Sequence, residues 1–180
     1  MNNILLSPHF CLDEFTKSST AIKHGIQNNP PQEAVENLRR LCANTLEPLR
    51  EELGLPVIIT SGFRTKALND LLAHSSERSQ HMQGQAADFY VAPLPSLGSG
   101  SGSASGAEES GLSRRELLIK AFRLIITSEQ IDYDQLILYP SFIHVSYVSR
   151  ERNRRTILLG MRNGKLGYGK CSVQNALKIQ

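Results

Sequence analysis

The sequence predicts an α+β fold in which a small, mainly antiparallel sheet carries helices on one face and a polar groove on the other. Two segments, 30–54 and 113–127, repeat apolar residues at helical spacing. Three others, 57–60, 86–92 and 134–148, alternate like strands and are bounded by turn residues. Acidic and imidazole side chains interrupt this alternation on one face only, which indicates that this face borders a groove.

The length and the charge balance limit the class of protein. A chain of 180 residues suits one compact domain, and we predict a single domain over 1–180 with a flexible Ser/Gly-rich surface loop at 92–111. Twenty Lys and Arg against 17 Asp and Glu give too small an excess to indicate nucleic-acid binding. Four arginines predict a solvated hairpin loop, with contact to an anionic polymer as the alternative: Arg150, Arg152, Arg154 and Arg155.

Residues 30–54 predict the first long helix. Pro31 suits its first turn, Gly54 lies just past its end, and Pro48 is expected to kink or interrupt its last third. Residues 7–21 predict a short helix that packs three apolar side chains onto the domain, Phe10, Leu12 and Phe15.

Two strands follow. Residues 57–60 predict a strand that ends in a turn delivering Arg64, and residues 65–74 predict a short helix. The next strand, 86–92, has side chains of two kinds. Its alternation places Ala86, Asp88 and Tyr90 on one face and Ala87, Phe89 and Val91 on the other.

A capping box of Ser113 and Glu116 begins the helix at 113–127. The core stripe of this helix consists of Leu117, Leu118, Ala121, Phe122 and Ile125. At the end of the chain, residues 155–170 predict a hairpin with an Asn-Gly turn at 163–164.

Residues 134–148 predict two strands folded back at a two-residue turn, Pro140-Ser141. Such a turn sets Tyr139 opposite Phe142, Ile137 opposite His144 and Gln135 opposite Ser146. Ile143, Val145 and Tyr147 form the core face of the second strand, so His144 points to the opposite face. Gln135, Tyr139 and His144 are therefore expected to share one surface.

Asp88 lies inside an apolar strand, where a carboxylate is costly unless a positive group meets it. A structural interpretation is a buried Asp satisfied by backbone donors or an arginine. The alternative uses His81, seven residues earlier, and His144 from an adjacent strand. Two neutral imidazoles and one carboxylate form a recurrent catalytic zinc set that leaves the fourth position open. We therefore expect one zinc at His81, Asp88 and His144.

Three motifs, "SGFR…N" at 61–69, "SQHMQGQAAD" at 79–88 and "FIHVSY" at 142–147, resemble the zinc D-Ala-D-Ala carboxypeptidase family of peptidoglycan metallopeptidases, in its phage or mobile-element branch. The resemblance implies a D-Ala-D-Ala carboxypeptidase/hedgehog-like fold with a zinc groove, and the same three metal ligands. It also implies that Arg64 faces the substrate or its polarised carbonyl, and that Ser79 contacts the substrate beside the metal.

The chain departs from this family in its general base. Related enzymes commonly place an acid three residues before the last histidine or on the neighbouring strand, where this chain has Ser141 and Tyr139. Asp134 is one catalytic candidate and Tyr139, as a hydrogen-bond donor, is another; Gln135 is a substrate-binding candidate on the same surface. A third interpretation is a catalytically weak or inactive zinc-containing cell-wall-binding or assembly module.

The expected partner is a peptidoglycan peptide, with no nucleic acid and no stable membrane association, and the expected state is a monomer. The N-terminal segment has no basic region, and no stretch approaches the roughly 20 apolar residues needed to span a bilayer. Three widely spaced cysteines fit a reducing compartment. We expect cytoplasmic synthesis and action at the cell wall after release by a membrane-permeabilising partner, as in a prophage or conjugative element.

Overall fold

The structure is a computed structural model that describes residues 4–73, 75–94, 112–162 and 165–179. Its centre is a six-stranded sheet with the order β3-β4-β6-β5-β7-β8. In chain order these strands are β3 (Val57–Ser61), β4 (Ala86–Val91), β5 (Gln135–Leu138), β6 (Ile143–Ser146), β7 (Thr156–Arg162) and β8 (Lys165–Lys170). A separate two-stranded sheet pairs β1 (Leu5–Ser7) with β2 (Phe10–Cys11).

The α+β class is confirmed, and the main sheet is mixed. β5 and β7 pair in parallel, whereas the other pairs of the main sheet are antiparallel. β6 ends opposite the first residue of β5, since Ser146 faces Gln135. The chain then crosses β5 and begins β7 beside the same Gln135, so β7 must run in the direction of β5. The sheet extends by β7 and β8 beyond the strands that frame the predicted groove.

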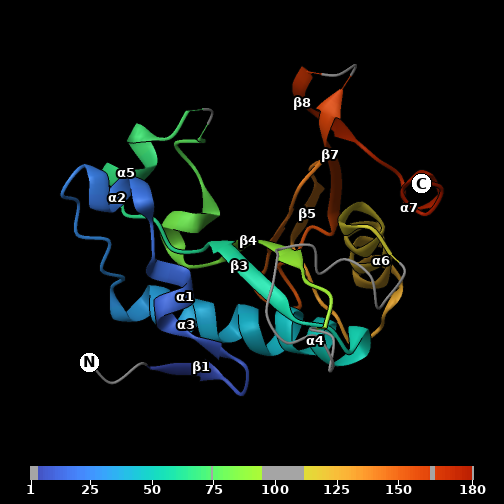
Figure 1. The fold of residues 1–180 in the computed structure, drawn as a ribbon, viewed down its shortest axis with the longest axis horizontal. Helices are drawn as coiled ribbons and strands as arrows, with labels where there is room; N and C mark the ends of the chain where they lie inside the picture. Colours follow the sequence, from blue (N-terminus) through green and yellow to red (C-terminus); the bar gives the residue numbers. More distant parts are fainter. Residues whose placement is uncertain (1–3, 74, 95–111, 163–164, 180) are drawn as a thin grey trace, which may run out of the picture.

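The N-terminal half carries most of the helices. They are α1 (Leu12–Thr16), α2 (Ser19–Lys23), α3 (Gln32–Leu41), the π-helix η1 (Cys42–Leu46), α4 (Glu47–Leu53), α5 (Lys66–Leu71) and the 3₁₀-helix η2 (Gln80–Gln83). The C-terminal half adds α6 (Arg114–Thr127) and α7 (Val173–Ala176). Figure 1 shows α3 and α4 running along one side of β3 and β4, with α6 beside β5.

The predicted interruption before Pro48 takes the form of the π-helix η1. Pro48 has no N–H to donate to the carbonyl of Asn44. That carbonyl instead accepts a hydrogen bond of 3.0 Å from the backbone N–H of Asp132. The hydroxyl of Thr45 donates to the Asp132 carbonyl, so the irregular turn of the helix is fastened to the segment before β5.

The prediction of one short helix over 7–21 was wrong in its detail. The chain there forms a β1–β2 hairpin and two short helices. Lys17 is the C-cap of the first helix, and Ser18 caps the second by accepting a 3.2 Å hydrogen bond from the N–H of Ala21. Phe10 and Phe15 are buried as expected, and Leu12 is partly buried against the core.

One hydrophobic core is built from residues on both sides of the Ser/Gly-rich segment. Phe89 and Val91 of β4 pack in the same cluster as Phe122 of α6 and Val145 of β6. The predicted stripe of α6 is buried throughout, and its capping box of Ser113 and Glu116 is present. Most of the predicted loop, 95–111, lies outside the described residues.

The predicted registers in the C-terminal half are confirmed. Ile137 pairs with His144 and Gln135 with Ser146, and the Tyr139 N–H donates to the Phe142 carbonyl at 3.0 Å. β7 and β8 form the expected hairpin. Its Asn-Gly turn at 163–164 lies outside the described residues.

Candidate metal centre

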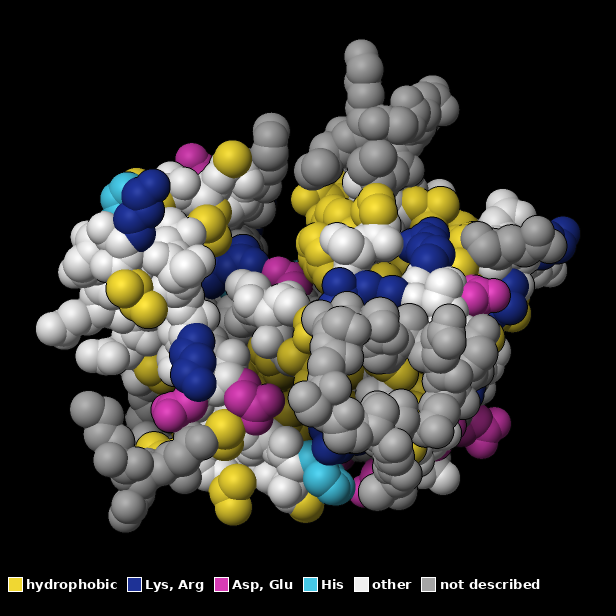
Figure 2. Space-filling model, in the orientation of Figure 1, with side chains coloured by type: hydrophobic (Ala, Val, Ile, Leu, Met, Phe, Trp, Pro, Cys, Tyr) yellow, Lys and Arg dark blue, Asp and Glu magenta, His cyan; other side chains and the backbone are white. Residues whose placement is uncertain are grey.

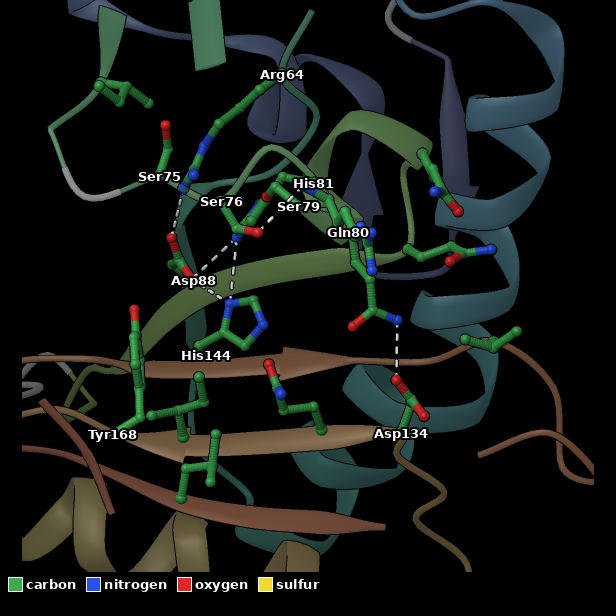
Figure 3. Close-up of a pocket in the computed structure, with 18 of the residues that line it drawn as sticks. Arg64, Ser75, Ser76, Ser79, Gln80, His81, Asp88, Asp134, His144 and Tyr168 are labelled. Carbon is green, nitrogen blue, oxygen red and sulfur yellow. Dashed lines mark hydrogen bonds and ion pairs between the residues drawn. The ribbon is translucent and has the colours of Figure 1, made fainter. Parts of the chain in front are cut away.

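Three side chains from separate elements converge at the floor of a groove (Figure 3). His81 comes from η2, Asp88 from β4 and His144 from β6. His81 Nε2 lies 3.2 Å from His144 Nδ1 and 3.3 Å from Asp88 Oδ1, while His144 Nδ1 lies 2.8 Å from Asp88 Oδ1. The three side chains are 4%, 12% and 12% exposed, respectively. Sequence reasoning named all three.

The sheet and one glycine turn position these side chains. Asp88 and His144 are direct cross-strand partners in the β4–β6 pair. η2 ends at Gly84, which has a left-handed φ of 68°. A Cβ on Gly84 would lie 2.3 Å from the carbonyl oxygen of Ala34 on α3, so only glycine allows this close approach. The turn therefore holds His81 over the start of β4.

The hydrogen bonds of His81 leave the nitrogen that faces the other two side chains free to bind a metal. Its Nδ1 lies 2.7 Å from the Gly62 carbonyl oxygen, which only accepts, so Nδ1 carries the proton. Burial lowers the pKa of His81 and outweighs the nearby Asp88 carboxylate, which raises it. The imidazole is neutral and turns the lone pair of Nε2 toward Asp88 and His144, as a metal ligand requires.

Arg64, delivered by the end of β3, meets the other oxygen of Asp88. Its Nη2 lies 2.8 Å from Asp88 Oδ2, and Nε and Nη2 both donate to the Ser61 hydroxyl. Burial alone would raise the pKa of the Asp88 carboxyl, but the hydrogen bond from His144 holds it well below its usual range. The carboxylate is thus satisfied by an arginine, as the structural interpretation expects, and is also met by two imidazoles, which that interpretation does not need.

The donor set fits zinc. Two ligands about 2.0–2.1 Å from a tetrahedral zinc are roughly 3.3 Å apart. Two of the three donor separations, 3.2 Å and 3.3 Å, match this value, and all three donor atoms lie within 4.8 Å of one another. Imidazole nitrogen and carboxylate oxygen are ligands that zinc accepts. His81, Asp88 and His144 would hold the ion.

The groove around the cluster has a volume of about 1080 Å³, just above the usual range for ligand pockets. Figure 2 shows it as a cleft between the α2–α5 side of the molecule and the β5–β7 side, with hydrophobic side chains on the latter wall. All the remaining predicted site residues line it: Arg64, Ser79, Asp134, Gln135 and Tyr139.

Asp134 lies at one end of the groove, away from His144 (Figure 3). It is buried and accepts hydrogen bonds from Gln80 Nε2 at 2.9 Å and from the Arg154 backbone N–H at 2.7 Å. The guanidinium of Arg154 forms an ion pair with it. Burial would raise the pKa of Asp134, but these bonds lower it. The carboxylate is fastened at the groove's end rather than beside the metal cluster.

Tyr139 lies toward the opposite end. Its ring stacks on Phe142 with the centroids 4.3 Å apart, and its hydroxyl donates to the Tyr168 hydroxyl at 3.1 Å. Burial raises the pKa of Tyr139, so the phenol stays protonated and acts as a donor. A Cβ on Gly160 of β7 would lie 2.3 Å from this ring, so the ring lies directly over the glycine.

Tyr168 and Gln80 are among the groove residues that sequence reasoning missed. Tyr168 reaches the groove because β7 joins β5 in parallel, a pairing that leaves no periodic trace in the sequence. Gln80 adjoins His81 in the quoted motif, and its side-chain contacts join residues more than 50 positions apart.

Comparison with known protein families gives a match. A family model described as Peptidase M15 matches residues 8–99, just over half of the chain. The matched segment contains Arg64, Ser79, His81 and Asp88, whereas His144 lies beyond it and joins the cluster through the β4–β6 pair. A search of curated proteins found no match.

Proposed function

This chain belongs to the peptidase M15 family of zinc D-Ala-D-Ala carboxypeptidase-like metallopeptidases, and on that premise we propose that it is a zinc-dependent peptidase that cleaves the peptide stems or cross-links of bacterial peptidoglycan. The observation that carries the proposal is the convergence of His81, Asp88 and His144 at the floor of a groove of peptide-binding size. The enzyme cuts either the last bond of the stem, as a carboxypeptidase, or a bond within the stem or its cross-link, as an endopeptidase.

Arg64 supplies the positive charge for the scissile carbonyl. Zinc, when bound, polarises that carbonyl and activates a water molecule. Arg64 uses Nε and Nη2 for Ser61 and Asp88, and its Nη1 has no partner among the described residues. This nitrogen is available to the carbonyl oxygen as negative charge develops on it. Ser79 and Gln135 line the groove and are proposed to hydrogen-bond the peptide.

Tyr139 is proposed to assist as a hydrogen-bond donor in the groove. Its phenol is protonated at neutral pH because burial raises its pKa, so it donates a hydrogen bond rather than acting as a base. Asp134 remains a candidate base only if it leaves Arg154 and Gln80, which together hold it at the groove's end. Release would break the ion pair with Arg154 and the hydrogen bonds from Gln80 and the Arg154 N–H, which is costly.

The deciding experiment digests purified peptidoglycan with the zinc-loaded protein and identifies the released fragments by mass. The expected result is soluble stem fragments whose masses reveal the bond cut, with no release after chelation. His81→Ala should lose both zinc and fragments. His24→Ala is the matched control, because His24 is an exposed histidine that lies outside the groove.

The alternative function is a zinc-containing cell-wall-binding module. It is favoured by one observation, the absence of a free acid beside the cluster among the residues that the structure describes. Zinc binding and co-sedimentation with peptidoglycan, without any released fragment, would replace the peptidase proposal with this one. Equal zinc content in the wild type and His81→Ala would contradict both.

The place of action is a further part of the proposal. We propose a monomer made in the cytoplasm that reaches the wall through a membrane-permeabilising partner in a phage or conjugative system. Its support is the three cysteines, which are all free and fit synthesis in a reducing compartment. No helix among the described residues is long and apolar enough to cross a bilayer. Co-expression with a permeabilising protein should cause lysis that depends on His144, and lysis without the partner would contradict the proposal.

A further inference from the structure

The two ends of the groove differ in chemistry. Tyr168 and Asp134 lie on opposite sides of His144 in Figure 3. The Tyr168 end is aromatic, with Tyr139 and Phe142 beside it. The Asp134 end is polar and basic, and Arg154 there is already paired with Asp134. A peptide that crosses the metal cluster therefore meets different surfaces on the two sides of its scissile bond.

Arg152 differs from the other arginines of its loop. Arg150 and Arg155 both form ion pairs with the buried Asp132, and Arg154 forms one with Asp134. Arg152 lines the groove, and its guanidinium has no hydrogen-bond or ion-pair partner among the described residues. The predicted solvated loop is thus fastened by three of its arginines, while the fourth is left for another anion.

The loop that presents Arg152 is ordered by bonds on both sides of it. The Val148 N–H donates to the Asn153 side chain at 2.9 Å, and the N–H groups of Arg152 and Asn153 both donate to the Ser149 carbonyl. Together with the three ion pairs, these bonds fix the backbone under Arg152. A fixed backbone reduces the entropy that is lost when the guanidinium binds a ligand.

A second arginine that lines the same groove lies beside the 79–88 motif in the sequence. Arg78 comes directly before Ser79, and within the described ranges its side chain likewise has no partner. Figure 2 shows Lys or Arg side chains on both walls of the cleft. Guanidinium groups bind carboxylates through two parallel hydrogen bonds, a geometry that a neutral amide cannot match.

We propose that Arg152, assisted by Arg78, forms a carboxylate-binding subsite, so that the enzyme selects peptides that bear a free carboxylate on one side of the scissile bond. This proposal rests on the proposed peptidase function and specifies its substrate class. Toward the aromatic end, the arginine that lines the groove among the described residues is Arg64, and the proposed mechanism already uses it for the scissile carbonyl. The selection is therefore one-sided.

The test uses four synthetic stem-like peptides in two matched pairs. In each pair a free carboxylate is exchanged for its amide, on one side of the scissile bond or on the other. For one pair, kcat/KM should be roughly 10-fold to 100-fold higher for the acid, because a charge-assisted hydrogen bond contributes about 1.5–3 kcal/mol. For the other pair, kcat/KM should be equal. No preference in either pair, or an equal preference in both, would overturn the proposal.

Two variants assign the preference to Arg152. Arg152→Gln should bring the ratio of kcat/KM for the preferred acid to kcat/KM for its amide close to one. Arg40→Gln is the matched control, because Arg40 is an exposed arginine that does not line the groove. A preference that survives in Arg152→Gln and in the double variant with Arg78→Gln would refute the subsite.

Binding measurements separate this proposal from the peptidase function. If the zinc-loaded protein cuts none of the peptides, the peptidase function fails. The subsite is then decided by titration: the zinc-loaded protein should still bind one acid more tightly than its amide, and Arg152→Gln should abolish the difference. Equal affinities in the wild type would reject the subsite as well.

Discussion

The two halves of the chain contribute to the groove in different ways. The N-terminal half supplies Arg64, His81 and Asp88 within one stretch that the family model matches. The C-terminal half supplies its groove residues from separate strands and a loop, among them His144, Tyr168 and Arg152. The contrast indicates that a compact local motif identifies the family, while the third candidate ligand and the chemistry of the groove's ends depend on how the second half pairs with it.

The strongest test of this comparison is His144→Ala. If the C-terminal half completes the metal site, zinc content should fall from about one ion per chain to almost none, and peptide cleavage should disappear with it. Metal analysis of the purified protein measures this directly, with His24→Ala as the control. Full zinc retention would mean that the N-terminal half holds the metal on its own.

The next largest effect is expected from Arg64→Ala in the matched half. Loss of a donor that stabilises the developing oxyanion should lower kcat by about 10²–10³-fold, with a smaller change in KM. Zinc content should persist, because the three ligands remain. Lys66→Ala provides the control, since Lys66 is exposed and pairs with Asp70. A variant whose kcat equals that of the wild type would remove Arg64 from the mechanism.

A smaller effect should follow from Gly160→Ala in the other half. The added methyl group would collide with the ring of Tyr139, so the ring must move away from Phe142 and Tyr168. We expect a loss of about 1–3 kcal/mol in unfolding free energy, together with slower turnover and unchanged zinc content. Gly169→Ala is the matched control, because nothing lies within 4 Å of a Cβ there. Equal turnover in the two variants would argue against a role for Tyr139.

The smallest expected effect on turnover is that of Asp134→Asn. Removal of the charge that Arg154 meets should lower the free energy of unfolding at neutral pH by about 1–3 kcal/mol. Because the folded pKa of Asp134 is lowered, this contribution is present above the unfolded value of about 3.9 and is lost as the pH falls through the folded pKa. Denaturation curves at several pH values should show that the difference in unfolding free energy between the wild type and Asp134→Asn decreases as the pH falls.

The same variant distinguishes an anchor from a general base. With Asp134 as an anchor, kcat should change by less than about tenfold, a smaller loss than the removal of a general base causes. A much larger loss, with the fold and the zinc intact, would return Asp134 to the catalytic role that the sequence left open.

The register of β5 and β6 could be predicted from the sequence because a two-residue turn and alternating side chains determine which residues face each other. The convergence of His81, Asp88 and His144 could be predicted because Asp88 and His144 interrupt apolar strands, where a polar side chain needs a partner, and His81 precedes one of these strands by a short turn. The parallel pairing of β7 with β5 could not be predicted from the sequence. The side-chain pattern of each strand is compatible with many partner strands. Tyr168 and Arg152 reach the groove only through that non-local pairing and the loop before it.

The pairing of β4 with β6 also affects when the candidate metal site can form during synthesis of the chain. Asp88 and His144 are 56 residues apart, so a growing chain presents the family motif well before it has three ligands. A ribosome that adds about 5–20 residues per second needs several seconds to cover that distance, and the sheet must then close before the ligands meet. A nascent or prematurely ended chain would have only two of the three ligands and would hold zinc poorly. Catalytic competence would then be the last property that the chain acquires during its synthesis.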